Sequence, residues 1–344
     1  MNKLLGIVTR ANQRRQDRKW NKYKDVLLTG IDNPIRRSNY NTVLDNQRRQ
    51  EERQYSYLTP PKGLLKQLLE QLGWNTQLDS HEKESEFMYQ LTKRVLDKLI
   101  CWDLVDVQSV ASVLPFVYFT EYDGSSKLSK RHAVLVKTRG LDVKTTLDAV
   151  GCVELRKAVL DELSTAIAKE INHDLLDTLA SISDQSSTPV SGEAYDYSSK
   201  AVEHLVNEIG NVNRRWRVNW AIMDYLTYYK WKNSAHSFYG NFISDEVHTA
   251  IAEEIKLAGI LYVGMTSTGV RLYVSDHLKT SLLVGCKGLE LDAGYIFSPY
   301  VLSGAMMVDS ETYEPILKFK IRYAEYVTGK HYYKSTDLYK THKE

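Results

Sequence analysis

The hydrophobic pattern is clearest over residues 153–182. Apolar side chains recur there at a spacing of about four residues and fall on one face of a helix. Each helical residue adds about 1.5 Å, so the helix has an expected length of roughly 45 Å. We therefore predict that Val153–Ile182 is a spine around which a domain is organised. Its apolar positions are Leu155, Val159, Leu163, Ile167, Ile171, Leu175 and Leu179.

Two shorter helices are predicted before this spine. Leu64–Leu72 is amphipathic and stops near Gly73, a residue that commonly ends helices. Glu82–Ile100 also has a helical period, with apolar residues at Phe87, Leu91, Val95 and Leu99.

Between these helices and the spine the pattern changes to alternation. Leu114–Thr120 alternates as a strand does, and the following Asp123-Gly124 is a strong turn signal. We predict a hairpin in which Ala133–Val136 is the returning strand and the basic residues lie near the tip. A two-stranded hairpin is marginally stable alone. It therefore lies either on a partner subunit or back on its own domain. The basic residues of the tip are Lys127, Lys130 and Arg131.

The second half of the chain mixes short strands with helices. Ser186–Ser199, with Pro189 and Gly192, is typical of a surface loop and marks a domain boundary. Beyond it we predict helices at Ala201–Ile209 and Asp245–Leu257. The predicted strands are Val218–Met223, Ile260–Val263, Val270–Val274, Ser281–Val284 and Tyr295–Phe297. This order indicates an α+β fold.

The N-terminal segment has a different composition. Residues 1–62 are rich in Arg, Asn and Gln, with scattered aromatic residues, and cannot close a core of their own. They contain 14 Lys and Arg against 6 Asp and Glu, whereas the whole chain of 344 residues has a net charge of only +2. A basic segment on a mildly acidic body is typical of an arm that binds nucleic acid, another protein or a neighbouring subunit. A solvated basic tail explains the same composition.

Membrane, export and metal signals are weak. The apolar run Val107–Phe119 is too short to cross a bilayer and contains Pro115, and no segment has the length of a signal-peptide core. We therefore expect no membrane association and a protein that stays in the cytosol. The three cysteines, Cys101, Cys152 and Cys286, have no CxxC spacing, which argues against a disulfide framework or a zinc site.

The enzyme motifs in the sequence are also incomplete. Gly264–Gly269 has the glycine spacing of a phosphate loop, but Val270 and Arg271 follow where Lys and Ser or Thr are needed. Cys286 precedes Lys287, which could activate a thiol, yet no base matches it, so a structural cysteine is favoured. We predict no catalytic site, no cofactor and no metal.

Three separated signals near the C-terminus resemble a known family. The segments are Ala293-Gly294-Tyr295-Ile296-Phe297-Ser298-Pro299-Tyr300, then Tyr313-Glu314-Pro315-Ile316, then Phe319-Lys320-Ile321-Arg322-Tyr323. Their order and spacing are similar to the end of the major capsid protein of T-even-type myoviruses. Upstream, Arg215-Trp216-Arg217-Val218-Asn219-Trp220 resembles that family's Arg-Gly-Arg-Gly-Asn-aromatic stretch with both glycines replaced. The resemblance covers about residues 110–330.

This resemblance implies the Hong Kong ninety-seven capsid fold of tailed bacteriophages. The parts it implies are an N-terminal arm with helices (1–100), an extended two-stranded loop (110–145), a peripheral domain with the spine helix (146–200 and 290–330), an axial domain (200–290) and a C-terminal tail (331–344). Copies of the chain would form hexamers and pentamers of an icosahedral head shell around packaged double-stranded DNA. The implied partners are further copies of the chain, scaffold and portal proteins, and decoration or vertex proteins. The implied location is the virion, after assembly in the host cytoplasm.

Two alternatives stay open at this point. One is a sister shell protein of the same fold, such as a vertex protein or an encapsulin-type compartment. The other is a nucleic-acid-binding protein that uses its basic arm and the aromatic and basic residues around Trp216 and Tyr228. The residues predicted to lie at assembly contacts are Arg14, Arg15, Arg18, Trp20, Lys127, Lys130, Arg131, Arg215, Arg217 and Arg322.

Overall fold

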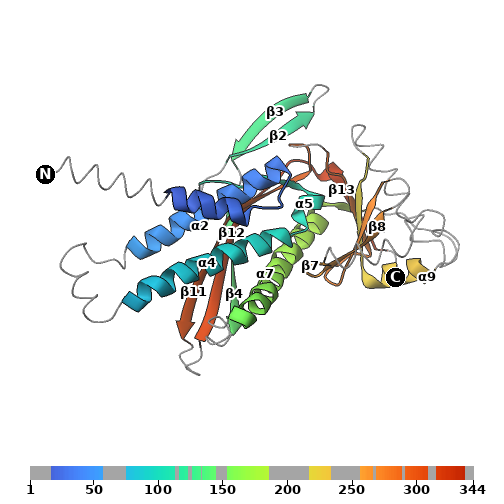
Figure 1. Ribbon diagram of the computed structural model, residues 1–344. Helices are drawn as coiled ribbons and strands as arrows, with labels where there is room; N and C mark the ends of the chain where they lie inside the picture. The colour runs from blue at the N-terminus through green and yellow to red at the C-terminus, as the bar shows by residue number, and fades with distance from the viewer. Residues whose placement is uncertain are drawn as a thin grey trace, which may run out of the picture.

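The computed structural model describes residues 17–56, 75–112, 116–122, 126–132, 134–144, 153–185, 217–233, 256–265, 269–288, 291–308 and 315–337. Long helices cross a four-stranded sheet, and a seven-stranded sheet lies beside them (Figure 1). The predicted helices Leu64–Leu72 and Ala201–Ile209 and the predicted loop Ser186–Ser199 lie outside the described residues. So does most of the helix predicted at Asp245–Leu257.

The four-stranded sheet has the order β1-β11-β12-β4. Its centre is the antiparallel pair β11 (Tyr295–Val308) and β12 (Pro315–Val327), far longer than the strand predicted at Tyr295–Phe297. β4 (Val134–Lys144) pairs with β12, and the two-residue β1 (Asp106–Val107) runs parallel to β11. The sequence analysis missed this length because Gly304 and the polar positions of β11 interrupt its alternation.

Three long helices pack on this sheet. α7 (Val153–Ile182) has the predicted bounds, and the described part of its apolar stripe is buried from Leu163 to Leu179. α4 (Asn75–Asp97) lies against α7 and is followed by the short α5 (Cys101–Leu104). α2 (Pro34–Ser56) contacts both α4 and β11.

The seven-stranded sheet has the order β5-β13-β10-β6-β9-β8-β7. Its central strands are the predicted ones: β6 (Trp220–Met223), β8 (Ile260–Met265), β9 (Arg271–Ser275) and β10 (Leu282–Gly285). The edges are β5 (Asp184–Gln185) and β7 (Lys256–Leu257). β13 (Tyr333–Thr336), after the short 3-10 helix η1 (Lys330–Tyr332), joins β10 and lies in the segment predicted to be a C-terminal tail. α9 (Tyr225–Asn233) follows β6.

The N-terminal segment is the largest departure from the sequence analysis. Residues 17–27 and α2 are helical, although no helix was predicted there. The helix begins at Asn33, whose Oδ1 accepts the N–H groups of Ile35 and Arg36 at 3.0 Å, with Pro34 in the first turn. α2 has few apolar residues, and hydrogen bonds from buried amide side chains hold it on the rest of the chain. Asn46 Nδ2 donates to Val110 O at 2.7 Å and to Tyr300 O at 2.9 Å.

The described part of the arm therefore packs on its own subunit. Leu28, Tyr40 and Leu44 are fully buried in the same core cluster as α4, α7 and both sheets. The prediction that this segment cannot close a core by itself fits the structure, because helices 17–27 and α2 use the rest of the chain. For residues 1–16, which lie outside the described residues, binding to nucleic acid, another protein or a neighbouring subunit stays a prediction.

Candidate assembly interface

A two-stranded ribbon projects from the body of the molecule (Figure 1). β2 (Phe116–Tyr122) pairs with β3 (Ser126–His132), from Phe116 opposite His132 to Tyr122 opposite Ser126. The prediction that Ala133–Val136 is the returning strand is wrong: that segment begins β4, in the four-stranded sheet. The basic residues lie along β3 and not at a distal tip. β2 ends at Tyr122 and β3 begins at Ser126, so the polar segment itself forms the partner strand, and Asp123-Gly124 lies outside the described residues.

Hydrogen bonds to the backbone of β2 hold the base of the ribbon. Gln108 Oε1 accepts the Tyr118 N–H at 2.9 Å, and Gln108 Nε2 donates to Tyr118 O at 2.5 Å. The Thr120 N–H donates to Leu291 O at 2.8 Å. A side-chain amide thus replaces a third strand along β2, and the ribbon is positioned by the chain segments before β2 and before β11.

The two faces of the ribbon have opposite environments because successive side chains of a strand alternate. Val117 and Phe119 are buried against Ile296, Ala324 and Tyr326. The other face exposes Phe116, Tyr118 and Leu128. Exposed apolar patches of this kind commonly mark protein contacts. We call Phe116, Tyr118, Leu128 and Lys130 the ribbon patch.

Lys130 and Arg131 lie on different faces of β3. Lys130 Nζ is 3.9 Å from the ring centroid of Phe116 and 5.5 Å from that of Tyr118, a cation–π arrangement within the ribbon patch. Arg131 is 3.6 Å from Glu121, whose carboxylate also accepts a hydrogen bond from Ser129 at 2.7 Å. Lys127 lies in β3 opposite Glu121 in the register. The ribbon therefore presents aromatic rings together with positive charge.

A second exposed apolar patch lies on α9, well away from the ribbon in Figure 1. Asp224 caps this helix: its Oδ1 accepts the Thr227 N–H at 2.6 Å. Tyr225, Leu226 and Tyr229 are exposed, whereas Tyr228 packs against the core. We call the three exposed residues the α9 patch. The sequence analysis had noted Tyr229 only as part of an aromatic and basic cluster.

The arm residues divide into three groups. Arg18 is exposed on the helix of residues 17–27, and Arg14 and Arg15 lie outside the described residues. Trp20 is buried, its ring lies 4.7 Å from that of Tyr89, and its Nε1 donates to Asp45 at 2.8 Å. The structure thus corrects the prediction for Trp20, because an indole with a satisfied N–H is held inside its own subunit by burial.

In the Arg-Trp-Arg-Val-Asn-Trp stretch, Asn219 and Trp220 make hydrogen bonds within the subunit. Arg215 lies outside the described residues and Arg217 is exposed. Asn219 makes two hydrogen bonds with the backbone of Lys287, at 2.5 and 3.1 Å. Trp220 is fully buried, and its Nε1 donates to Leu104 O at 3.0 Å. These two residues join β6 to β10 and α5, a role that sequence reasoning did not assign.

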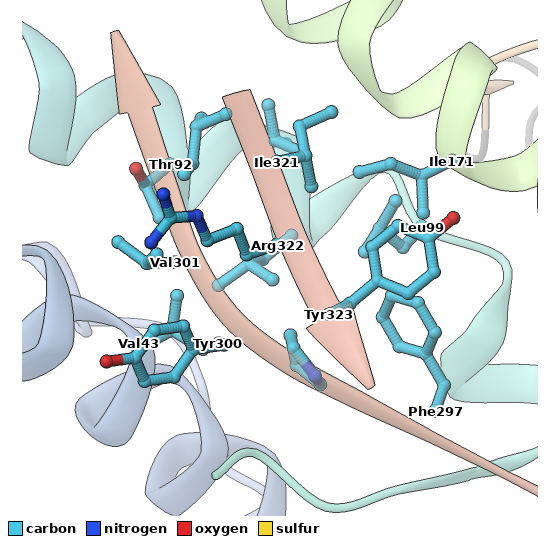
Figure 2. A pocket seen from close by; sticks show the side chains of 14 residues that line it. Val43, Thr92, Leu99, Ile171, Phe297, Tyr300, Val301, Ile321, Arg322 and Tyr323 are labelled. Carbon is cyan, nitrogen blue, oxygen red and sulfur yellow. The ribbon is translucent and has the colours of Figure 1, made fainter. Parts of the chain in front are cut away.

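Arg322 lies in β12, half-buried beside a small apolar cavity of about 30 Å³ between the sheet and the helices (Figure 2). Val43, Thr92, Leu99, Ile171 and Val301 lie around it. This volume is that of about one water molecule, so the cavity is a packing defect and not a substrate site. Arg322 stays a prediction as a contact residue.

The described residues include buried titratable side chains. They contain no cluster of three or more His, Cys, Asp or Glu side chains placed to hold a metal ion, and no helix among them is long and apolar enough to cross a membrane. Burial raises the pKa of the Cys101 thiol to about 12. Lys287 donates to Trp102 O at 2.6 Å, and burial lowers the pKa of this ammonium group.

Two sheets, a long spine helix and separate exposed contact patches define a structural protein that acts by association with other chains. The sequence matches the family described as "Major capsid protein Gp23" over residues 120–343. The chain belongs to this family of bacteriophage major capsid proteins, which form the head shell, and it has the α+β capsid fold that the sequence analysis predicted. Its place is accordingly the virion.

Solved structures are similar at low sequence identity. A chain of Mycobacterium phage Che8 is 9% identical, with a TM-score of 0.45, covering 66% of this chain and 85% of that one. A virus-like particle from Pyrococcus furiosus gives 7% identity and a TM-score of 0.48, covering 73% and 98%. The capsid of cyanophage P-SCSP1u is 11% identical, with a TM-score of 0.43, and the match covers 70% of this chain and 88% of that one. No individually curated protein matches the sequence.

Proposed function

We propose that copies of this chain form hexamers and pentamers that close an icosahedral head shell around packaged double-stranded DNA. The observation that carries this proposal is the presence of two different exposed apolar patches on separate parts of the subunit. The ribbon patch is a β-strand surface with a lysine, and the α9 patch is a helical surface. A contact between unlike surfaces is heterologous, and repeated head-to-tail contacts form rings when the rotation between subunits closes.

We further propose the division into parts that the family resemblance implies. The peripheral domain comprises residues 146–200 and 290–330, and the axial domain comprises residues 200–290. The two separate sheets support this division, since β11 and β12 lie in one and β6 to β10 in the other, although β5 and β13 of the second sheet fall outside residues 200–290. The extended-loop unit 110–145 contains the ribbon and β4, which pairs with β12 of the peripheral domain. The arm with its helices covers residues 1–100, and the segment 331–344, predicted to be a tail, contributes β13 to the seven-stranded sheet.

The remaining proposals concern partners. Scaffold, portal, and decoration or vertex proteins complete the particle, which assembles in the host cytoplasm, and the subunit carries out no catalysis. DNA is enclosed non-specifically and without tight binding to the shell. The net charge of only +2 supports this, because a strongly basic lining would bind the phosphate backbone tightly. A sister vertex or encapsulin-type protein would instead differ in its copy number per particle.

Assembly tests the two patches directly. Leu128→Glu in the ribbon patch and Tyr229→Glu in the α9 patch place a charge on side chains that are 61% and 66% exposed. Both variants should keep the circular-dichroism spectrum and melting temperature of the parent chain and fail to form closed shells in electron micrographs. The matched control is Val26→Glu, since Val26 is 67% exposed and belongs to neither patch.

Two results would contradict the proposal. Normal shells from both patch variants would show that neither patch is needed for assembly. A stable monomer that binds DNA with a steep dependence on salt, and makes no particles with a scaffold, would favour the nucleic-acid-binding alternative. Counting copies in purified particles separates a major shell protein from a vertex protein.

A further inference from the structure

Two histidines from distant parts of the chain stack on one another where α7 meets the seven-stranded sheet. His173 lies on α7, and His277 lies in the loop between β9 and β10. The ring centroids are 3.8 Å apart, and the planes differ by only 3°. The His173 side chain is 15% exposed and that of His277 is 29% exposed. Close parallel stacking of this kind suits neutral imidazoles, because two imidazolium ions at this distance repel each other.

Charged groups surround the pair from both elements. On α7, Asp177 Oδ2 is 3.2 Å from His277 Nε2, and on the loop, Asp276 Oδ1 is 3.9 Å from His173 Nε2. Each carboxylate also has a lysine partner: Lys279 is 2.9 Å from Asp177, and Lys169 is 3.3 Å from Asp276.

The surroundings of His173 favour its neutral form. Asp276 favours the charged form of this ring, but it does not outweigh the groups that oppose it. Glu170 is a further carboxylate on α7 and acts more weakly on His173 than Asp276 does. Burial, then the neighbouring His277 and Lys169, lower the pKa of His173.

The rest of the contact is built from polar groups and backbone. Asn172, next to His173, donates from Nδ2 to Ala258 O at 3.0 Å. Gly259 has a positive φ of 74°, and a Cβ there would lie 3.2 Å from His173 Nε2 and 3.0 Å from Lys169 Cγ. The β7–β8 turn therefore presses on the same face of α7 with backbone atoms.

From this geometry we infer that the stacked His173–His277 pair is a proton-operated latch between the spine helix and the seven-stranded sheet. When both rings are neutral, the loop of residues 275–279 is held on α7. Protonation places two positive charges face to face and releases this loop, while Asn172 and the contact of α7 with β13 keep the sheet attached. The latch adjusts the position of the sheet on the helix in acid and does not unfold the subunit.

The direction of the pKa shift of His173 determines how the latch depends on pH. The pKa of His173 is lower in the folded chain than in the unfolded one, so the latch contributes fully above the ordinary histidine value of about 6.5. Its contribution falls as the pH decreases below that value. His277 is one of the groups that lower the pKa of His173, so a proton on one ring disfavours a proton on the other.

Hydrogen exchange of the full-length chain tests the latch. After correction for the intrinsic rates, lowering the pH from 8 to 5 should raise exchange at least tenfold in residues 269–285 and leave α7 itself unchanged. The double variant His173→Phe/His277→Phe keeps two flat rings without a titrating group and should show less than a twofold rise. The control His331→Phe alters a histidine outside the latch, whose ring lies tilted at 4.6 Å from that of Tyr332, and should retain the full rise.

The proposal is overturned if the parent chain shows no rise in this loop, or if the double variant shows the same rise. A measurement on the parent chain does not depend on how the variants fold. With labelled histidine side chains in nuclear magnetic resonance, two of the nine histidines should titrate in coupled, biphasic steps. Single independent titration curves for both rings would equally reject the latch.

Discussion

Several single residues have roles that follow only from what they touch. Trp20 and Trp220 both bury an indole and satisfy its N–H, with Asp45 and with Leu104 O. Tyr323 donates to Asp174 at 2.5 Å, so Asp174 faces the sheet while its neighbour His173 faces the other histidine. Adjacent helical residues do not share a face, so His173 and Asp174 have separate contacts.

Gly285 gives a prediction at this scale. A Cβ at this position would lie 2.1 Å from the Trp220 ring, so alanine cannot fit without moving the indole. Gly285→Ala should lower the free energy of unfolding by about 1–3 kcal/mol, the usual cost of overpacking. Urea unfolding followed by tryptophan fluorescence measures it.

A double-mutant cycle supplies the control for Gly285. Trp220→Phe removes part of the ring, so the effect of Gly285→Ala should be clearly smaller in that background. If the two substitutions were additive, the close approach to Trp220 would not be the cause of the destabilisation.

At the scale of elements, polar anchors decide where the helices lie. α2 is fastened through Asn39, Asn46 and Gln47, all buried, and Thr92 of α4 donates to Gln47. The end of α4 is tied to α7 by Lys98, whose ammonium donates to the Asp161 carboxylate at 2.7 Å and to Thr165 at 2.7 Å. Buried amides cost little when each is fully hydrogen-bonded.

The Lys98–Asp161 contact predicts a dependence on pH. The hydrogen bond from Lys98 lowers the pKa of Asp161, although burial opposes this shift. The carboxylate therefore stabilises the fold above its unfolded value of about 3.9, and this contribution is lost as the pH falls through the lower folded value. Lys98→Met should cost at most about 1 kcal/mol at pH 7, because Asp161 is 63% exposed.

Chemical denaturation of parent and Lys98→Met at pH 7 and pH 3 measures this effect. The difference between the two chains should shrink in acid. Lys93→Met is the matched control, since Lys93 pairs with Asp97 within the same helix at 2.8 Å. An unchanged difference at pH 3 would show that Lys98 acts through its alkyl chain and its hydroxyl partners alone.

At the scale of the whole molecule, one core cluster joins the arm, the long helices and both sheets. The ribbon and α9 expose apolar side chains outside it. A subunit of this design has a shared core over its described residues and exposes separate apolar surfaces. Residues 1–16 precede this core in the chain and carry four Lys and Arg residues with no Asp or Glu.

Removal of residues 2–16 tests the role of that segment. These residues precede the anchored helix 17–27, so the shortened chain should melt within about 2 °C of the parent, as surface changes cost little. Its shells should form poorly, since Arg14 and Arg15 are removed. Melting by circular dichroism and particle counts by microscopy measure the two effects.

The double variant Arg14→Gln/Arg15→Gln is the control for length. It should show the same defect in assembly as the deletion if positive charge is the cause. Normal shells from both variants would mean that this segment is only a solvated tail.

The sequence alone determined the elements that depend on local periodicity and on motif. The α7 bounds, the four central strands of the seven-stranded sheet and the capsid family all follow from residue patterns, because these signals are written within short windows. Only the tertiary structure decided the strand pairing of β2, the helical fold of residues 17–56, the burial of Trp20 and the stacking of His173 on His277. These features depend on contacts between residues far apart in the chain, such as Asn46 with Tyr300, and no local pattern encodes such contacts.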